Sequence, residues 1–114
     1  MTLRIAVPTI GDRGMIDTVS DVFSRAETFT ILEVEGGEIR EVRTEKNIAS
    51  TLKQGAGPLA VNNLKEMGVD TVLSAELGPG AKTLLKAFDI KIIKVESGIT
   101  VCKAVKDALK KSIS

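Results

Sequence analysis

The segment ETFTILEVEGGEIREVRT, residues 27–44, predicts a β-hairpin from which the rest of the fold can be worked out. Phe29, Ile31 and Val34 mark a first strand over residues 27–35. Gly36-Gly37 suits a two-residue turn, because such turns require backbone conformations with positive φ. In residues 38–44, Ile39 and Val42 alternate imperfectly with Glu and Arg. Charges of this kind are typical of an edge strand, where they discourage aggregation.

Outside the hairpin, short apolar runs alternate with amphipathic segments. The runs 3–8, 69–75 and 90–95 predict three more strands, and the first is apolar enough to be central in a sheet. One helix is expected to have Pro58 at its first position and to end at Gly68. A second helix begins at Gly78-Pro79-Gly80, and a third follows Thr100 as its N-cap. The mixed segment Val19–Ala26 is expected to hold one helical turn around Val22 and Phe23.

The resulting order, β-β-β-α-β-α-β-α, restricts the topology. The first three strands form an antiparallel meander, and each later strand is reached through a helix and a right-handed crossover. The simplest sheet is five-stranded and mixed, in the order 3-2-1-4-5, with strand 2 antiparallel to the others. Both crossover helices then lie on one face and the last helix on the other. The sequence therefore predicts a single three-layer α/β/α domain over residues 1–114.

The composition narrows the classes of function. The chain has 114 residues, 43% of them hydrophobic, which is enough for one core. Its 16 basic and 15 acidic residues leave a net charge of +1, and there is no Trp or Tyr, so nucleic-acid binding is not expected. No apolar run reaches the length of a membrane span, and the first residues lack a signal-peptide layout. Cys102 is the only cysteine, so no internal disulfide forms. A cytoplasmic protein is expected.

A binding site is expected where the carboxyl ends of the parallel strands meet. In open sheets, ligands bind at this end of the strands, where neighbouring connections leave in opposite directions. Here that end is formed by the loops 9–19, 75–80 and 96–100, which are rich in glycine. Glycines let a ligand approach backbone N–H groups and helix N-termini. The candidate ligand-binding residues are Thr9, Gly11, Gly14, Arg25, Gly78, Gly80 and Thr100.

A series of short motifs gives the chain a family resemblance. The motifs are Arg4-Ile5-Ala6-Val7-Pro8, Val19-Ser20 with Phe23 and Arg25-Ala26, Gly55-Ala56-Gly57-Pro58, Leu64 with Gly68-Val69-Asp70, Leu77-Gly78-Pro79-Gly80-Ala81, and Gly98-Ile99-Thr100. In this order they resemble the dinitrogenase iron–molybdenum cofactor biosynthesis family. The resemblance covers nearly the whole chain. It implies a ribonuclease-H-like fold and binding of an iron–sulfur cluster or a precursor of the iron–molybdenum cofactor.

One part of the resemblance is broken. Where the family pattern reads Val-Ser-x-His-Phe-Gly-Arg-Ala, this chain has Val22 in place of the histidine and Ser24 in place of the glycine. The chain contains no histidine at all. A metal ligand of that kind is therefore missing, and so is the general base of a Ser-His-Asp triad.

The sulfur-containing side chains are the candidate metal ligands. Cys102 follows the start of the last helix, where the helix dipole favours a thiolate, and thiolates bind iron–sulfur clusters and zinc. Met15 could add a thioether from the loop after the first strand. For both side chains a packing role is the favoured alternative, since free cysteine is often buried and methionine commonly closes loops over apolar surface.

Three functions remain open on the sequence alone. The first is a non-catalytic carrier that binds a metal cluster or a small anion and meets a cluster-assembly or acceptor protein, as a monomer or a homodimer. The second is a metal-dependent hydrolase using Asp12 and Glu76, although Asp12 beside Gly11 is also ordinary turn chemistry. The third is a protein-interaction module that uses the charged edge strand or an exposed sheet face. No catalytic constellation is recognisable, so the carrier is favoured and enzymatic activity is not expected.

Overall fold

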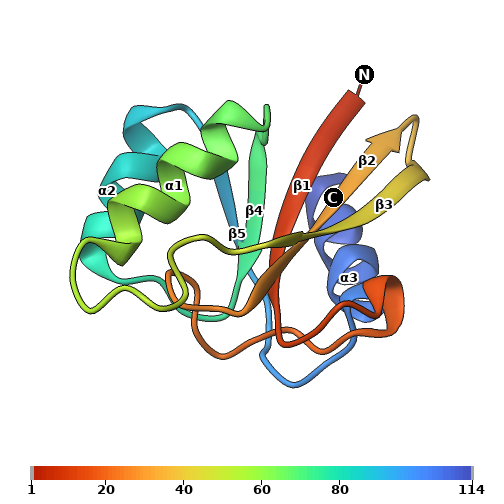
Figure 1. The fold of residues 1–114 in the computed structure, drawn as a ribbon. Helices are drawn as coiled ribbons and strands as arrows, with labels where there is room; N and C mark the ends of the chain where they lie inside the picture. Colours follow the sequence, from red (N-terminus) through yellow and green to blue (C-terminus); the bar gives the residue numbers. More distant parts are fainter. Residues whose placement is uncertain (1, 114) are drawn as a thin grey trace.

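The computed structural model describes residues 2–113, with the side chains of residues 2–110. Over these residues the chain forms five strands, three α-helices and one short 3-10 helix (Figure 1). The strands are β1 (Thr2–Thr9), β2 (Thr28–Glu35), β3 (Glu38–Lys46), β4 (Thr71–Ser74) and β5 (Lys91–Lys94). The helices are η1 (Gly14–Ile16), α1 (Ala56–Glu66), α2 (Pro79–Ala87) and α3 (Val101–Ile113).

The strands form one mixed sheet in the order β3-β2-β1-β4-β5. β1 and β3 both run antiparallel to β2, whereas β4 is parallel to β1 and β5 is parallel to β4. The predicted order and the reversed direction of strand 2 are confirmed. The sheet is mixed because a tight turn can join only antiparallel neighbours, while the later strands return through helices.

The hairpin explains the imperfect alternation of its second strand. Gly36 and Gly37 have φ values of 61° and 82°, as the two-residue turn requires. The register shifts beyond this turn, so that Val34 pairs with Ile39 but Glu33 pairs with Glu41. Arg40 is thus an extra residue, a β-bulge. Because of the bulge, apolar side chains three positions apart in β3 reach the same face of the sheet.

Two apolar clusters hold helices against the two faces of the sheet. α1 and α2 cover one face, where Ala6 of β1 packs with Leu64 and Leu85. α3 covers the other face, where Ile5 and Val7 meet residues of that helix. Figure 1 shows α1 and α2 together on one side and α3 on the opposite side. This is the predicted three-layer arrangement. None of the helices in the described part of the chain is long and apolar enough to span a lipid bilayer.

The helix ends largely follow the sequence signals. The Thr100 hydroxyl accepts a hydrogen bond of 3.2 Å from the Lys103 N–H, so the predicted N-cap is confirmed. Gly68 follows α1 with a φ of 78°, which suits a glycine at a helix end. α1 begins at Ala56, earlier than Pro58 alone indicates.

The segment Val19–Ala26 contains no helix. A single hydrogen bond of 3.2 Å from the Ala26 N–H to the Phe23 carbonyl closes one turn at its end, and the short helix in this part of the chain is η1. The Val19 N–H donates to the Ile99 carbonyl at 2.8 Å and the Ser20 N–H donates to the Pro8 carbonyl at 2.8 Å. These contacts hold residues 18–20 extended between the end of β1 and the loop before α3. Tertiary hydrogen bonds therefore override a weak local preference.

Candidate functional site

The loops that follow β1, β3, β4 and β5 all lie at the same end of the sheet, where the carboxyl ends of these strands meet. This follows from the strand directions, and Figure 1 shows these loops along the lower side of the domain. Two hollows lie there, of about 330 and 290 Å³, and both are lined by Glu76. Together they are called the crevice below. Its first hollow is lined by Asp21, Val22, Phe23, Ser24, Arg25, Glu76 and Gly78, and its second by Ser74, Ala75, Glu76, Leu77, Lys82, Ile92 and Lys94.

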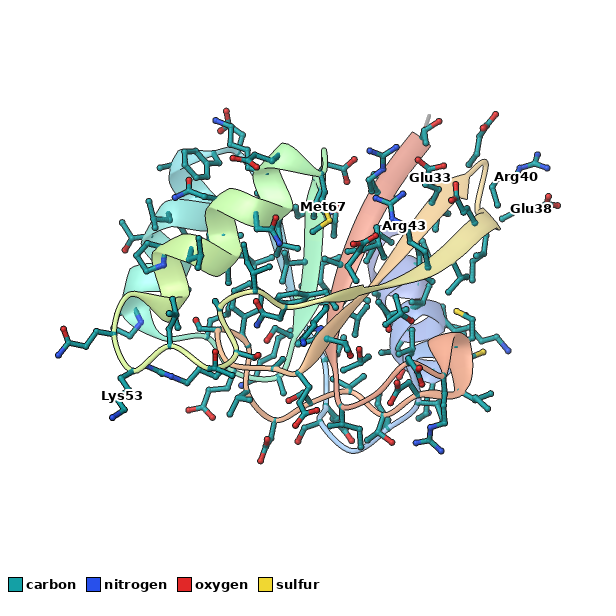
Figure 2. The ribbon with its side chains drawn as sticks, viewed as in Figure 1. Glu33, Glu38, Arg40, Arg43, Lys53 and Met67 are labelled. Carbon is teal, nitrogen blue, oxygen red and sulfur yellow. The ribbon has the colours of Figure 1, made fainter. Side chains whose placement is uncertain are left out.

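One wall of the crevice is the segment 21–25, which the loop after β3 holds in place. The Arg25 guanidinium donates to the carbonyls of Leu52 at 2.9 Å and Lys53 at 2.8 Å. Figure 2 shows the Lys53 side chain pointing outward from this loop. The buried Asn47 amide donates to the carbonyls of Ser24 and Ala26. The two bonds to carbonyls fix the direction of the Arg25 side chain. A guanidinium has five N–H donors, so further donors remain to bind a ligand.

The opposite wall is the N-terminus of α2, where the backbone is open. A Cβ atom added to Gly78 or Gly80 would meet nothing within 4 Å. A Cβ atom on Gly57, by contrast, would lie 3.4 Å from the Ser24 hydroxyl and 3.8 Å from Ala81. The start of α1 thus packs closely against both walls, while the start of α2 faces open space. Exposed N–H groups at a helix N-terminus favour an anion.

Charged side chains of both signs line the crevice. Arg25, Lys82 and Lys94 contribute positive charge, and Asp21 and Glu76 contribute negative charge. All five residues are exposed. The cationic excess and the α2 N-terminus act in the same direction, so the electrostatics suit a small anionic ligand.

Not all the candidate ligand-binding residues reach the crevice. Arg25 and Gly78 line it, and Gly80 is the second residue of α2, two positions after Gly78. Thr9 is fully buried, and its hydroxyl bonds to the hydroxyls of Thr28 and Thr30. Arg25, Gly78 and Gly80 therefore lie at or beside the crevice, whereas Thr9 joins β1 to β2.

Gly11 and Gly14 belong to the loop after β1. A Cβ atom on Gly11 would lie 3.2 Å from the Asp17 carboxylate, and one on Gly14 would lie 3.6 Å from Val42. Asp17 is fully buried and accepts hydrogen bonds from the N–H groups of Arg13 and Thr18. These two glycines therefore allow the loop to fold tightly around a buried carboxylate.

The sulfur-containing candidates lie on the α3 side of the sheet. Cys102 is half-buried and lines a separate hollow of about 480 Å³ on α3, together with Thr100 and Lys106. Met15, on η1, packs against the apolar cluster beneath α3. Neither residue lines the crevice hollows.

The acidic candidates are divided in the same way. Glu76 lines both crevice hollows, whereas Asp12 is exposed in the loop after β1. Within residues 2–113, His, Cys, Asp and Glu side chains form no group of three that could hold a metal ion. The geometry gives no support to a two-metal hydrolase, which needs clustered acids.

Several crevice residues were not among the candidates. Val22, Phe23 and Ser24 form its first wall, and Lys82 and Lys94 line its second hollow. The family motif around Val22 was the available signal for the wall. Asn47 carries no motif, and only its buried hydrogen bonds reveal its role.

Comparisons with known proteins place the chain in a family. An uncharacterised protein of Methanocaldococcus jannaschii is 30% identical over 83% of this chain and 76% of its own length. The apo form of the orange protein from Desulfovibrio gigas is 31% identical, with a TM-score of 0.85 over 95% of this chain and 88% of that chain. A Thermotoga protein solved by NMR is 34% identical, with a TM-score of 0.76 over 96% and 88%.

A family model described as dinitrogenase iron-molybdenum cofactor matches residues 1–111. The match includes every element that forms the crevice, and it supports a role in binding or carrying a cofactor. The chain belongs to the dinitrogenase iron-molybdenum cofactor family.

Proposed function

We propose that this chain is a non-catalytic carrier that holds an anionic metal–sulfur cluster, or a precursor of one, in the crevice. The observation that carries the proposal is the pair of hollows, both lined by Glu76, beside the open N-terminus of α2. Family membership and the apo form of the orange protein support a bound cofactor. The carrier delivers its cargo to an assembly or acceptor protein.

The ligand is held chiefly by charge and by backbone N–H groups. Arg25 is oriented by two carbonyls, and Lys82 and Lys94 line the second hollow. Gly78 and Gly80 leave the backbone of α2 uncovered. Such donors bind the oxygen or sulfur atoms of an anion without a covalent bond to the metal, so the cargo can be released intact.

Val22 stands where the family pattern has a histidine, so the proposed binding does not use an imidazole ligand at this position. It lines the first hollow and is 47% exposed. An isopropyl group offers no lone pair to a metal, so in this chain the position supplies only an apolar surface for the cargo. Cys102 lines another hollow and has no part in the proposed site.

The test is anaerobic incubation of the purified protein with iron, sulfide and molybdate, followed by desalting. We expect a retained visible chromophore and a metal content near one cluster per chain. Gly78→Ala should lower retention several-fold, because the methyl group covers the N-terminus of α2. This change should leave the fold intact, since Gly78 has a φ of −65° and open space beside it, although alanine at this N-cap position should lower stability by up to about 1 kcal/mol.

Two further variants separate the possible sites. Arg25→Gln removes charge from the crevice and should lower retention, whereas Cys102→Ser should leave it unchanged. No retained chromophore in the wild type would refute the proposal. Loss in Cys102→Ser with full retention in Arg25→Gln would move the site to α3.

A further inference from the structure

The outer side of β5 is an edge of the sheet. In the described part of the chain, β5 pairs only with β4. The Lys91 N–H donates to the Asp70 carbonyl at 2.9 Å and the Val95 N–H donates to the Ser74 carbonyl at 3.1 Å. Because backbone groups alternate along a strand, the N–H and C=O of Ile92 point away from β4. The opposite edge, β3, is interrupted by the Arg40 bulge.

Hollows continue along this edge from the crevice to α3. A hollow of about 580 Å³ is lined by Lys94, Val95, Glu96, Asp107 and Lys110. It shares Lys94 with the crevice, and it shares Asp107 and Lys110 with the 480 Å³ hollow on α3. An extended segment could therefore lie along β5 and continue onto the helix.

The surface around this edge is strongly cationic. Residues 82–110 contain seven lysines and three acidic residues, a net charge of +4, although the whole chain has a net charge of only +1. All seven lysines are exposed. By contrast, residues 28–46 of the hairpin contain five acidic and three basic residues, a net charge of −2. The seven lysines are Lys82, Lys86, Lys91, Lys94, Lys103, Lys106 and Lys110.

The charges select among possible occupants. A second copy of this chain is disfavoured, because pairing two β5 strands edge to edge gathers Lys91 and Lys94 of both copies along one seam, where like charges repel. A nucleic acid is disfavoured because the chain has no Trp or Tyr on which bases could stack. A peptide strand can form hydrogen bonds with the N–H and C=O groups of Ile92, and acidic side chains on that strand can form ion pairs with the exposed lysines around β5.

We propose that the β5 edge and the adjoining face of α3 form a docking site for an acidic, extended segment of a partner protein. The segment adds a sixth strand to the sheet at Ile92, and its carboxylates lie near Lys91 and Lys110. The site adjoins the crevice, but it is independent of the cofactor, so it is tested with the unloaded protein.

The probe is a blocked peptide, acetyl-EVEVE-amide, with acetyl-KVKVK-amide as its matched control. At low ionic strength, the acidic peptide should bind saturably and the basic peptide should not. Hydrogen exchange by NMR should show slower exchange of the Ile92 amide. The Lys91 and Val95 amides already bond to β4, so their exchange should be unchanged.

Charge-reversal variants test the lysines without touching the crevice. Lys91→Glu and Lys110→Glu should each weaken peptide binding about three- to tenfold, as expected for exposed charge pairs that change from attractive to repulsive. Lys46→Glu, at the end of β3, is the control and should have no effect. Equal binding of both peptides, or an unchanged Ile92 amide, would overturn the proposal. Tighter binding of a single-stranded oligonucleotide than of the acidic peptide would also overturn it.

Discussion

Asn47 offers the sharpest test of how the crevice wall is held. Its side chain is 1% exposed and makes three hydrogen bonds. The amide donates to the carbonyls of Ser24 at 3.0 Å and Ala26 at 2.8 Å, and its oxygen accepts from the Ala49 N–H at 3.0 Å. Asn47→Ala removes all three bonds at once and leaves three backbone groups without these partners.

The expected cost can be worked out from these contacts. Each hydrogen bond contributes about 1 kcal/mol net, and a buried group left unsatisfied costs about 1–3 kcal/mol. Water reaching the partly buried Ser24 carbonyl would recover part of that loss. We therefore expect Asn47→Ala to lower the free energy of unfolding by about 3 kcal/mol, a large share of the roughly 5–15 kcal/mol typical of a domain.

Urea unfolding followed by far-UV circular dichroism measures this loss, because the chain has no Trp or Tyr to report by fluorescence. Asn62→Ala is the matched control, since Asn62 is exposed on α1 and alanine there slightly favours the helix. A loss below about 1 kcal/mol for Asn47→Ala would refute the assigned role, because even one lost bond should cost that much. Asn47→Asp keeps the acceptor but loses both donors, so it should also destabilise the fold.

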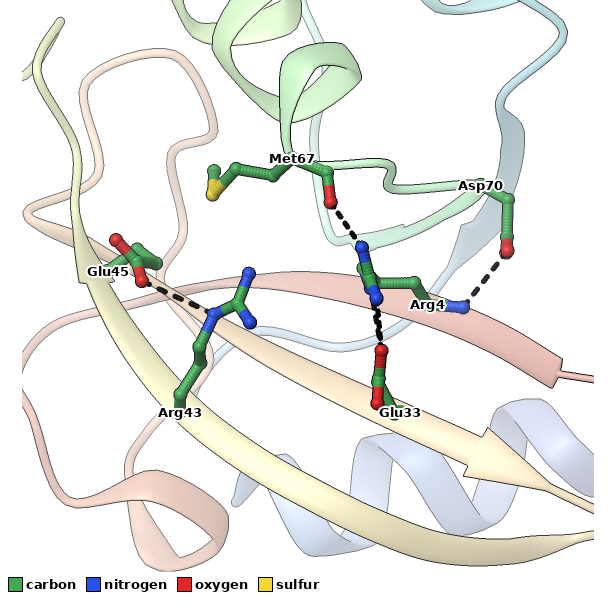
Figure 3. A network of polar contacts seen from close by, with 6 residues as sticks. All are labelled: Arg4, Glu33, Arg43, Glu45, Met67 and Asp70. Carbon is green, nitrogen blue, oxygen red and sulfur yellow. Dashed lines mark hydrogen bonds and ion pairs between the residues drawn. The ribbon is translucent and has the colours of Figure 1, made fainter.

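Three further predictions concern single contacts and use the same unfolding measurement. Gly68→Ala should lower the free energy of unfolding by about 2 kcal/mol, because Gly68 has a φ of 78° and its added Cβ would lie 2.8 Å from Arg4 Nη1. Gly55→Ala is the comparison: Gly55 has a φ of 76° but no neighbour within 4 Å, so the loss should be about half as large. Thr100→Ala should cost about 1 kcal/mol through loss of the α3 N-cap, and Thr100→Ser should not; equal losses would argue against the cap. The hydrogen bond from Arg4 holds the pKa of Glu33 below its ordinary value of 4.5 (Figure 3), so this carboxylate stabilises the fold above that pH and the gain is lost as pH falls through the lower, folded-state pKa. The urea midpoint should thus fall more between about pH 6 and about pH 3 in the wild type than in Glu33→Gln, and parallel falls would contradict this assignment.

The fold could be predicted because its signals are local. The Gly36-Gly37 turn fixes the hairpin, and the helices between later strands fix the parallel half of the sheet. Thr100 identifies the start of α3 by its side chain alone. Strand order then follows from chain direction, so few alternatives remain.

The segment 18–20 could not be predicted for the opposite reason. Its conformation depends on bonds to Pro8 and Ile99, which are distant in the sequence. The Arg40 bulge was visible only as the unexplained spacing of Ile39 and Val42. Long-range partners of this kind leave little trace in composition or periodicity.

The sequence predicted at which end of the strands the candidate site lies, but not which residues form it. Topology places every loop after a parallel strand at that end of the sheet, yet which side chains meet there depends on how the loops pack. The loop after β1 folds around its own buried Asp17, whose carboxylate accepts hydrogen bonds from the N–H groups of Arg13 and Thr18. Gly11 and Gly14 serve that loop, while Cys102 faces a hollow on α3. The crevice is built instead by the segment at Val22, which a distant asparagine holds in place.

Val22 decides how the family site is to be understood in this chain. At 47% exposure, the valine leaves apolar surface in the crevice. The position where the family pattern has a histidine therefore offers no lone pair to a metal in this chain, although the chain has the family fold. The same crevice keeps an oriented Arg25 and an uncovered helix N-terminus at Gly78. If cargo still binds here, its charge and shape must therefore be what these groups recognise, and this is why removal of one charge or addition of one methyl group is the decisive experiment.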